Sequence, residues 1–295
     1  MQLFLEQTIN GVALGSLYAL FGIGFGLVFA TLGILNAAHG TYASWAAIVA
    51  YYALDWYGAP FPVAAAAGVI AGGTIAVVVD QIAFQPLRNR GTGLLGALIT
   101  SIAFWIILDS LAGQATEHQT FAFPATSFPT RMLELGAIRV PIMQVIVITS
   151  LVVCATGIYL LIQKTLVGAA MRAVGWNSVA AALGGVNSRI VILLTAFLAG
   201  ATSGLAGVLA GVTTSNVSFT LGEGLMLKGF AAVVVGGFED VRGTAVAGIM
   251  LGVIEVSAAQ YLSTSFRDGI TYTLLLLFLM LRPRGLFGST NFLRA

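Results

Sequence analysis

Long apolar stretches separated by short polar connections are the feature that most constrains this chain. Residues 145–162 and 190–212 contain no charged side chain and do not alternate between apolar and polar positions. Only 8% of the 295 residues are charged, against about 25% in a soluble domain, and 58% are hydrophobic. A helix of about 20 apolar residues crosses a bilayer, whereas barrel strands alternate. The sequence therefore predicts an all-α polytopic integral membrane protein.

Eight apolar runs have the length of membrane spans, and a ninth run at 224–237 is short and contains Lys228. This ninth run is consistent with either a broken crossing or a re-entrant segment. We expect eight or nine segments within a single transmembrane domain, 1–295, because no polar connection is long enough to form its own core. The first run has no preceding basic residue, so we interpret it as a retained span. The eight runs are 8–33, 40–57, 61–84, 94–112, 141–163, 189–212, 243–262 and 268–281.

The basic residues are distributed unevenly between the two sides of this topology. With 224–237 counted as a crossing, three arginines fall on one side, at 131, 139 and 267. Nine basic residues fall on the other side, at 88, 90, 164, 172, 189, 242, 282, 284 and 294. The richer side is expected to be cytoplasmic. This places the N-terminus outside, the C-terminus in the cytoplasm, and 113–140 as the largest external loop.

Glycine accounts for 36 residues, and many recur at helical spacing. Small residues at this spacing allow helix backbones to approach closely in lipid. We interpret most of these glycines as packing positions, and some could permit broken helices around a substrate path. The spaced sets are Gly11 with Gly15, Gly22 with Gly26, and Gly200, Gly204, Gly207 and Gly211.

The predicted cytoplasmic connection 164–189 is patterned rather than a plain linker. Asn177 or Ser178 can cap a helix over 179–183, and Gly184 with Gly185 can end it. Such a helix is either a surface connector or a segment that docks in the groove of a partner protein. For docking, Trp176 and Leu183 would anchor the contact, and the small side chains at 180–182 would allow close approach.

Short sequence blocks along almost the whole chain resemble the LivH-type permeases of branched-chain amino acid ABC transporters. Each block is weakly specific alone, but together they follow the order of the family. Ala37 is a departure, because many relatives carry a larger apolar residue there. The blocks are Asn10-Gly11, LGSLYAL at 14–20, NAAHG at 36–40, QPLR at 85–88, GAAMRA at 168–173, LGGVN at 183–187, KGF at 228–230, VGG at 235–237, Gly248 through Gly252 to Glu255, and RPRGLFG at 282–288.

The resemblance implies a non-catalytic permease subunit that works by alternating access in a prokaryotic cytoplasmic (inner) membrane. It implies three kinds of partner: a second, LivM-like permease, two cytoplasmic ATPase subunits, and a periplasmic or extracellular solute-binding protein. No GxxxxGK[ST] loop is present, so we expect ATP and Mg to be used by the partner ATPases and no cofactor or metal to be bound by this chain. The net charge of +2 does not favour nucleic-acid binding. The residues expected to couple to the ATPases are Trp176, Asn177, Ser178, Val179, Ala180, Ala181, Leu183 and Gly184.

Polar residues within or beside the apolar runs are candidates for the translocation path, or for hydrogen bonds between helices. We expect His39 to satisfy backbone groups at a helix end, with a proton relay or ligand contact as the alternative. Lys228 and Glu255 are expected either to form an ion pair or to face the path. Asp80 and Asp109 lie near span ends and are expected to reach interfacial water. The candidate path residues are Ser16, Tyr18, Asn36, His39, Asn216, Ser218, Lys228 and Glu255.

Three other functions are consistent with parts of the sequence. A permease for urea or short-chain amides would share the same sequence blocks. An intramembrane enzyme is disfavoured because neither HExxH nor GxSxG occurs. A stand-alone channel would leave the patterned segment 164–189 unexplained.

Overall fold

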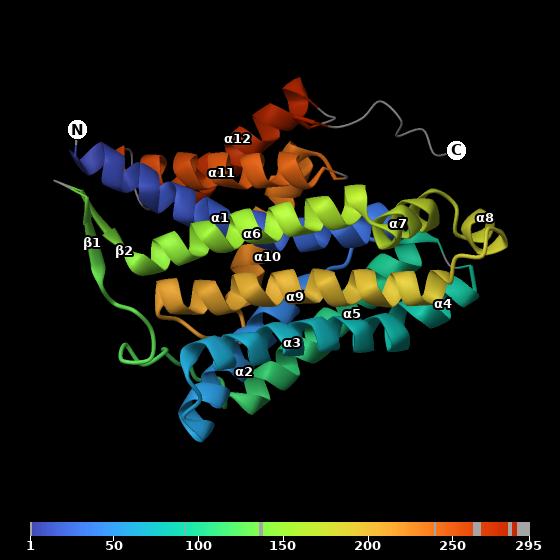
Figure 1. Ribbon diagram of the computed structural model, residues 1–295, viewed down its shortest axis with the longest axis horizontal. Coiled ribbons are helices and arrows are strands. Elements are labelled where there is room, and N and C mark those ends of the chain that lie inside the picture. Colours follow the sequence, from blue (N-terminus) through green and yellow to red (C-terminus); the bar gives the residue numbers. More distant parts are fainter. Residues whose placement is uncertain are drawn as a thin grey trace.

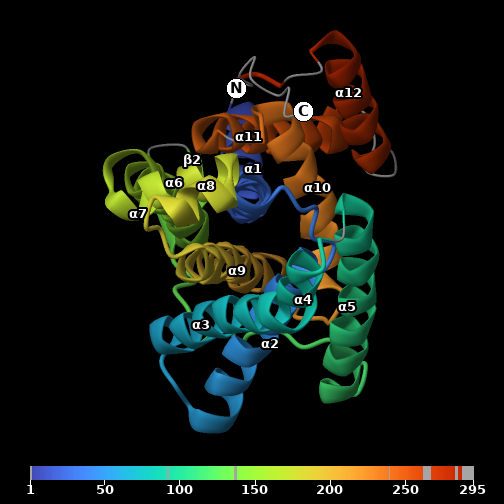
Figure 2. The ribbon, with the colours of Figure 1, turned by 90° about the vertical axis from the view of Figure 1, so that its right-hand side faces the viewer.

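Two long helices, α1 (Gln2–Leu32) and α9 (Ser188–Thr214), lie at the centre of the fold, and the other helices surround them (Figures 1 and 2). The computed structural model describes residues 2–91, 93–135, 138–238, 240–261, 267–282 and 285–287. The other elements, in chain order, are α2 (His39–Tyr57), α3 (Phe61–Val79), the π-helical turn η1 (Asp80–Phe84), α4 (Gln85–Asn89), α5 (Leu94–Ala115), β1 (Met132–Leu135), β2 (Ile138–Pro141), α6 (Ile142–Lys164), α7 (Leu166–Trp176), α8 (Ser178–Leu183), α10 (Leu221–Gly236), α11 (Val241–Tyr261) and α12 (Arg267–Leu281).

Six helices in the described part of the chain are long and apolar enough to cross a membrane. The polytopic helical class is therefore confirmed. The predicted runs 40–57, 224–237 and 268–281 are also helical, as α2, α10 and α12, but they are not among these six. The count of eight or nine crossings stays a prediction. The six are Gln2–Leu32, Phe61–Asn89, Leu94–Ala115, Ile142–Lys164, Ser188–Thr214 and Val241–Tyr261.

Glycines let several pairs of helices pack backbone against backbone, as the sequence predicted, including α1 with α11 and α3 with α9. In the first pair, Gly11 and Gly15 of α1 face Gly248 and Gly252 of α11. A Cβ atom added at Gly15 would lie 2.6 Å from the Cα atom of Ile249, closer than real contacts permit. These positions therefore accept only glycine without a shift of the helices.

The second glycine seam joins α3 to α9. Gly68 and Gly72 of α3 lie against Gly200 and Gly204 of α9, and a Cβ atom added at Gly72 would meet the Gly200 carbonyl oxygen at 2.8 Å. The two seams tie α11 to α1 and α3 to α9, so each central helix holds a neighbour by close backbone contact.

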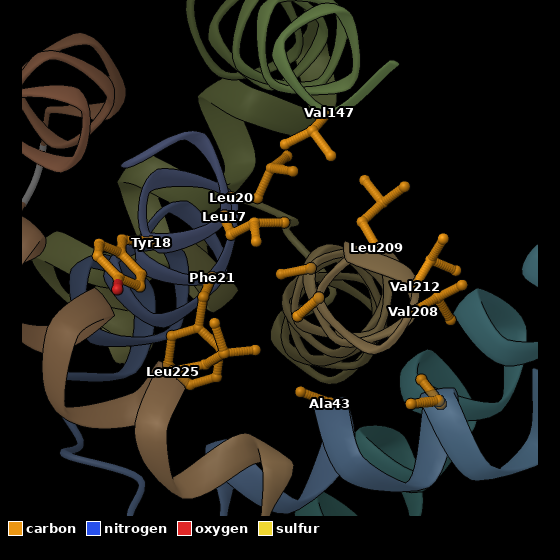
Figure 3. Close-up of a cluster of buried hydrophobic side chains, with 14 of the residues drawn as sticks. Leu17, Tyr18, Leu20, Phe21, Ala43, Val147, Val208, Leu209, Val212 and Leu225 are labelled. Atoms are coloured by element: carbon orange, nitrogen blue, oxygen red, sulfur yellow. The ribbon is translucent and has the colours of Figure 1, made fainter. Parts of the chain in front are cut away.

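The largest apolar cluster fills the space between the central helices and their neighbours. Leu17 of α1 points toward Leu209 of α9, Leu20 lies beside Val147 of α6, and Phe21 lies beside Leu225 of α10 (Figure 3). By contrast, α5 and α6 expose many large apolar side chains on their outer faces. In a bilayer these faces are solvated by lipid, which explains why so apolar a surface is compatible with folding.

A short antiparallel hairpin of β1 and β2 lies beside the N-terminus, within the segment predicted as the largest external loop (Figure 1). Phe121 and Val217 form an isolated antiparallel bridge that ties this segment to the connection between α9 and α10. Helices α4, α7 and α8 lie at the opposite end of the bundle (Figure 1). Arg284, Arg294 and part of the predicted block at 282–288 lie outside the described residues, as does the end of the span at 262.

Candidate coupling and translocation sites

Residues 164–189 fold into two short helices, α7 and α8, that project from one end of the bundle (Figure 1). The predicted helix over 179–183 is present as α8, and Asn177 is its cap. The side-chain oxygen Oδ1 of Asn177 accepts hydrogen bonds from the amides of Val179 (3.0 Å) and Ala180 (2.9 Å). Only Gly185 adopts the left-handed conformation (φ +86°), whereas Gly184 does not.

Helix α7 was not anticipated, although the sequence carries a signal for it. Thr165 precedes an apolar stretch, and its Oγ1 accepts a hydrogen bond from the amide of Gly168 at 3.0 Å, capping the helix. The hydroxyl before a helical run is the usual N-cap pattern. The connection is therefore a two-helix structure.

Trp176 at the end of α7 and Val179 and Leu183 of α8 are large apolar residues with exposed fractions of 72%, 69% and 87%. We call this set the apolar cap. Ala181, in contrast, is only 7% exposed and packs with Met171 of the same chain. Ala181 is therefore packed within this chain, and its role in contact with a partner stays a prediction.

The break between α1 and α2 is closed by Asn36. Its Oδ1 accepts from the amide of Ala38 (3.0 Å), and its Nδ2 donates to the hydroxyl of Tyr42 (3.0 Å). The Ala37 amide donates to Oγ of Ser101 (3.1 Å). Asn36 is thus a structural residue that holds the loop in shape.

His39 is fully buried at the first position of α2, with the rings of Phe21, Phe25 and Tyr42 edge-on to its imidazole. Neither ring nitrogen makes a hydrogen bond of ordinary geometry with the described residues. The expectation that its side chain satisfies a helix end is therefore wrong, because Asn36 does this. The backbone carbonyl of His39 accepts from Oγ of Ser203 (3.1 Å) and links α2 to α9.

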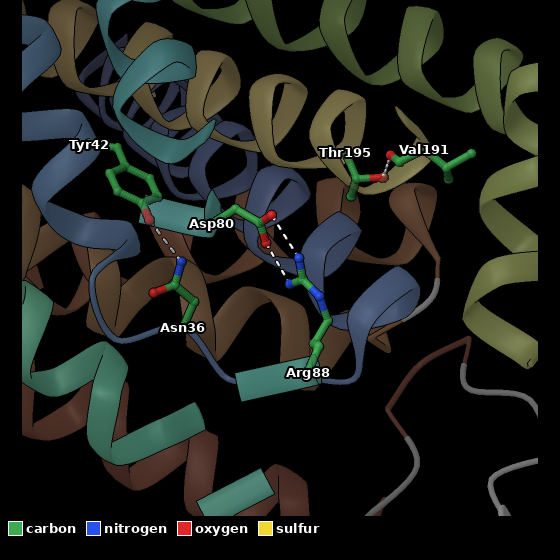
Figure 4. A network of polar contacts seen from close by, with 6 residues as sticks. All are labelled: Asn36, Tyr42, Asp80, Arg88, Val191 and Thr195. Atoms are coloured by element: carbon green, nitrogen blue, oxygen red, sulfur yellow. Dashed lines mark hydrogen bonds and ion pairs between the residues drawn. The ribbon is translucent and has the colours of Figure 1, made fainter. Parts of the chain in front are cut away.

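Asp80 is not at an interface with water, contrary to the expectation. The helix that begins at α3 continues through η1 into α4 and brings Arg88 to Asp80, and the guanidinium donates two hydrogen bonds of 2.7 and 2.8 Å to the carboxylate (Figure 4). Asp80 is only 2% exposed. Asp109 also has one buried carboxyl oxygen, without a hydrogen-bond partner among the described residues.

The predicted ion pair between Lys228 and Glu255 is present, with Nζ and Oε1 2.5 Å apart. The same nitrogen lies 2.9 Å from Oδ1 of Asp268, and 5.5 Å from the centre of the Tyr18 ring. Elements α1, α10, α11 and α12 therefore meet at one charged cluster. Asp268 was missed because it opens the last predicted span, where sequence alone assigns no partner.

The eight candidate path residues do not gather at one place. Tyr18, Lys228 and Glu255 meet in the cluster just described, whereas Asn36 and His39 lie at the break between α1 and α2. Ser16 is buried and donates to the carbonyl of Val12 within its own helix. The remaining two, Asn216 and Ser218, lie on the connection between α9 and α10.

Comparison with known proteins shows which protein family this chain matches. Residues 7–281 match the family described as the branched-chain amino acid transport system permease component. The LivH high-affinity branched-chain amino acid permease protein of Escherichia coli K12 is 31% identical, covering 97% of this chain and 96% of the relative. The BraD permease protein of Pseudomonas aeruginosa is 29% identical over the same shares. The galactofuranose transporter permease YtfT of Escherichia coli K12 is 29% identical, over 74% of this chain and 60% of the relative.

Proposed function

Because this chain belongs to the permease-component family of branched-chain amino acid transport systems, we propose that it is the transmembrane permease subunit of an ATP-driven importer for branched-chain or other apolar amino acids. The observation that carries the proposal is the match itself, which covers residues 7–281 and relatives of nearly the same length. The chain is a membrane protein with at least six helices suited to crossing. Its own part in transport is mechanical and does not include ATP hydrolysis.

The apolar cap supplies the contact with the ATPase subunits in this proposal. Three large, exposed apolar residues stand on the projection formed by α7 and α8, at the end opposite the β-hairpin. In the proposed orientation this end is cytoplasmic, and the N-terminus and the hairpin lie outside. An apolar helix face of this kind inserts into a groove of a partner, so movement of the ATPases is transmitted through α8 and α7 to α9 and α1.

The subunit composition of the complex is inferred from the same family membership. We infer a prokaryotic inner-membrane complex of this chain, a second LivM-like permease, two ATPase subunits and a solute-binding protein, with alternating access and eight or nine membrane segments. The outer faces of α5 and α6 expose many large apolar side chains, which suits contact with lipid and with a neighbouring permease. The alternative is an importer of urea or short-chain amides. An uptake assay distinguishes the two, because the complex would then import urea and not leucine.

The test is uptake of radiolabelled leucine into proteoliposomes that contain the permeases and ATPases, with the binding protein outside. Two variants, Val179→Asp and Leu183→Asp, place charge on the apolar cap and are expected to abolish ATP-driven uptake while the chain still inserts. The matched control is Met132→Asp, an exposed apolar residue on β1 at the other end, which should transport normally. Normal uptake in both cap variants would contradict the coupling assignment, and uptake of urea instead of leucine would favour the alternative.

A further inference from the structure

A cavity of about 320 Å³ opens between α1, α6, α7 and the start of α11, and none of the eight candidate path residues lines it. Its walls are mostly apolar, from Ile23 and Leu27 of α1, Met171 of α7 and Phe238 of the turn before α11. Its volume is near the lower end of the range for small-molecule sites, about 300–1,000 Å³, which suits a ligand of amino-acid size.

Two side chains of opposite charge line the same hollow, Arg172 of α7 and Asp240 at the start of α11. One guanidinium nitrogen of Arg172 donates to the carbonyl of Ile162, which fixes the side chain and leaves other N–H groups of its five available. Oδ1 of Asp240 accepts hydrogen bonds from the amides of Arg242 (2.8 Å) and Gly243 (3.3 Å), and it lies 3.6 Å from Nε of Arg242. Both charges are thus positioned by the chain rather than free to swing.

We propose that this cavity binds a zwitterionic α-amino acid with an apolar side chain, as the release site at the ATPase end of the permease. Arg172 binds the carboxylate, Asp240 binds the ammonium group, and the apolar wall receives the side chain. A ligand with only one charge would make only one of these two charge-assisted contacts and would therefore bind more weakly. Helix α7 supplies Arg172 and Met171 and leads directly to α8, so movement of the apolar cap alters this site.

This proposal rests on the proposed function, because that function supplies the amino acid. A phospholipid head group carries the same two charges and is the rival occupant. The wall of the cavity includes Trp176, which is largely exposed and supplies an optical probe of occupancy.

The test is titration of the purified complete complex, without binding protein or ATP, followed by tryptophan fluorescence. L-Leucine is expected to produce a saturable change that is lost in Trp176→Phe. Isoamylamine, which lacks the carboxylate, and 4-methylpentanoate, which lacks the ammonium group, should each bind about tenfold or more weakly. Phosphoethanolamine tests the lipid head group, and tighter binding of it than of leucine would overturn the proposal.

Two charge variants complete the experiment. Asp240→Asn keeps an oxygen that caps α11 while it removes the charge, and Arg172→Gln removes the guanidinium; each should weaken leucine binding about tenfold or more. Lys164→Gln, an exposed basic residue at the end of α6 outside the cavity, is the matched control and should bind normally. Unchanged leucine binding in both charge variants, or no saturable response in the wild type, overturns the release site.

The outcomes separate this site from the proposed function. A complex that imports leucine but shows no charge-dependent leucine binding at this cavity keeps the proposed function and refutes the release site. A complex that imports no amino acid under any condition refutes the proposed function directly, whatever the titration shows.

Discussion

The ammonium nitrogen of Lys228 lies 2.5 Å from a carboxyl oxygen of Glu255, in a position where the glutamate is fully buried. A second contact of the same nitrogen, to Asp268 at 2.9 Å, extends the pair to α12. A buried charge without a counter-ion is far more costly than a buried pair. The lysine of α10 therefore fixes the positions of α11 and α12 through electrostatics.

Replacement of Lys228 with methionine should lower the free energy of unfolding by about 3–5 kcal/mol, because Glu255 would remain buried without its cation. The double variant Lys228→Met/Glu255→Met should recover much of this loss. Thermal unfolding in detergent, followed by size exclusion, measures both. The control is Glu134→Gln, which removes an exposed pair with Arg139 and should leave the midpoint unchanged. Equal stability of wild type and Lys228→Met would show that the pair has no structural role.

Gly252→Ala should separate α1 from α11 and lower stability, because the added methyl group would meet the backbone of Gly11 and Gly15. Gly157→Ala on α6 is the matched control, since nothing lies within 4 Å of its added Cβ atom. It should be neutral or slightly stabilising, by up to about 1 kcal/mol from helix propensity. Similar midpoints for the two variants would mean that the first seam is not a close contact.

Arg88→Met should destabilise the chain by about 3 kcal/mol or more, because it leaves the carboxylate of Asp80 buried alone. Arg88→Lys should recover only part of the loss, since a lysine cannot form the two parallel hydrogen bonds of a guanidinium. The exposed neighbour Arg90 provides the control as Arg90→Met. Thermal midpoints in the order Arg90→Met, Arg88→Lys, Arg88→Met, from highest to lowest, are expected; any other order counts against the bidentate pair.

Asn177→Ala should lower the stability of α8 by about 1 kcal/mol, because two amides at the start of the helix lose their hydrogen-bond acceptor. Asn177→Asp keeps the acceptor and should behave like the wild type. Hydrogen exchange at the Val179 and Ala180 amides reports the change directly. Ser178→Ala is the control, because the cap of α8 is formed by Asn177. Unchanged protection in Asn177→Ala would show that α8 is held by packing alone.

The membrane helices could be predicted from the sequence because a span is a continuous apolar run, and such runs are visible one residue after another. The start of α9, for example, was expected at residue 189, and the helix begins at Ser188. The cap at Asn177 was also predictable, since it depends on one side chain and the next three amides. These features are local.

The features that were missed depend on contacts between distant segments or on helical phase. Asp80 was assigned to water because the span was expected to end at residue 84, whereas the helix continues and brings Arg88 to it. Ala181 lies on a helix of six residues, too short for its pattern to show which side faces inward. Arg172 and Asp240 share a cavity only because α7 and α11 both pack beside α1.

The pairing of α1 with α11 has a consequence for how the protein is made. Synthesis begins with α1, whose glycine face is complementary to a helix near the other end of the chain. Until the ribosome has completed α11, the glycine face of α1 lacks the helix against which it packs. A chain truncated before α11 therefore leaves this face of α1 uncovered. The close packing of α1 is therefore completed only late in translation, once α11 has been made.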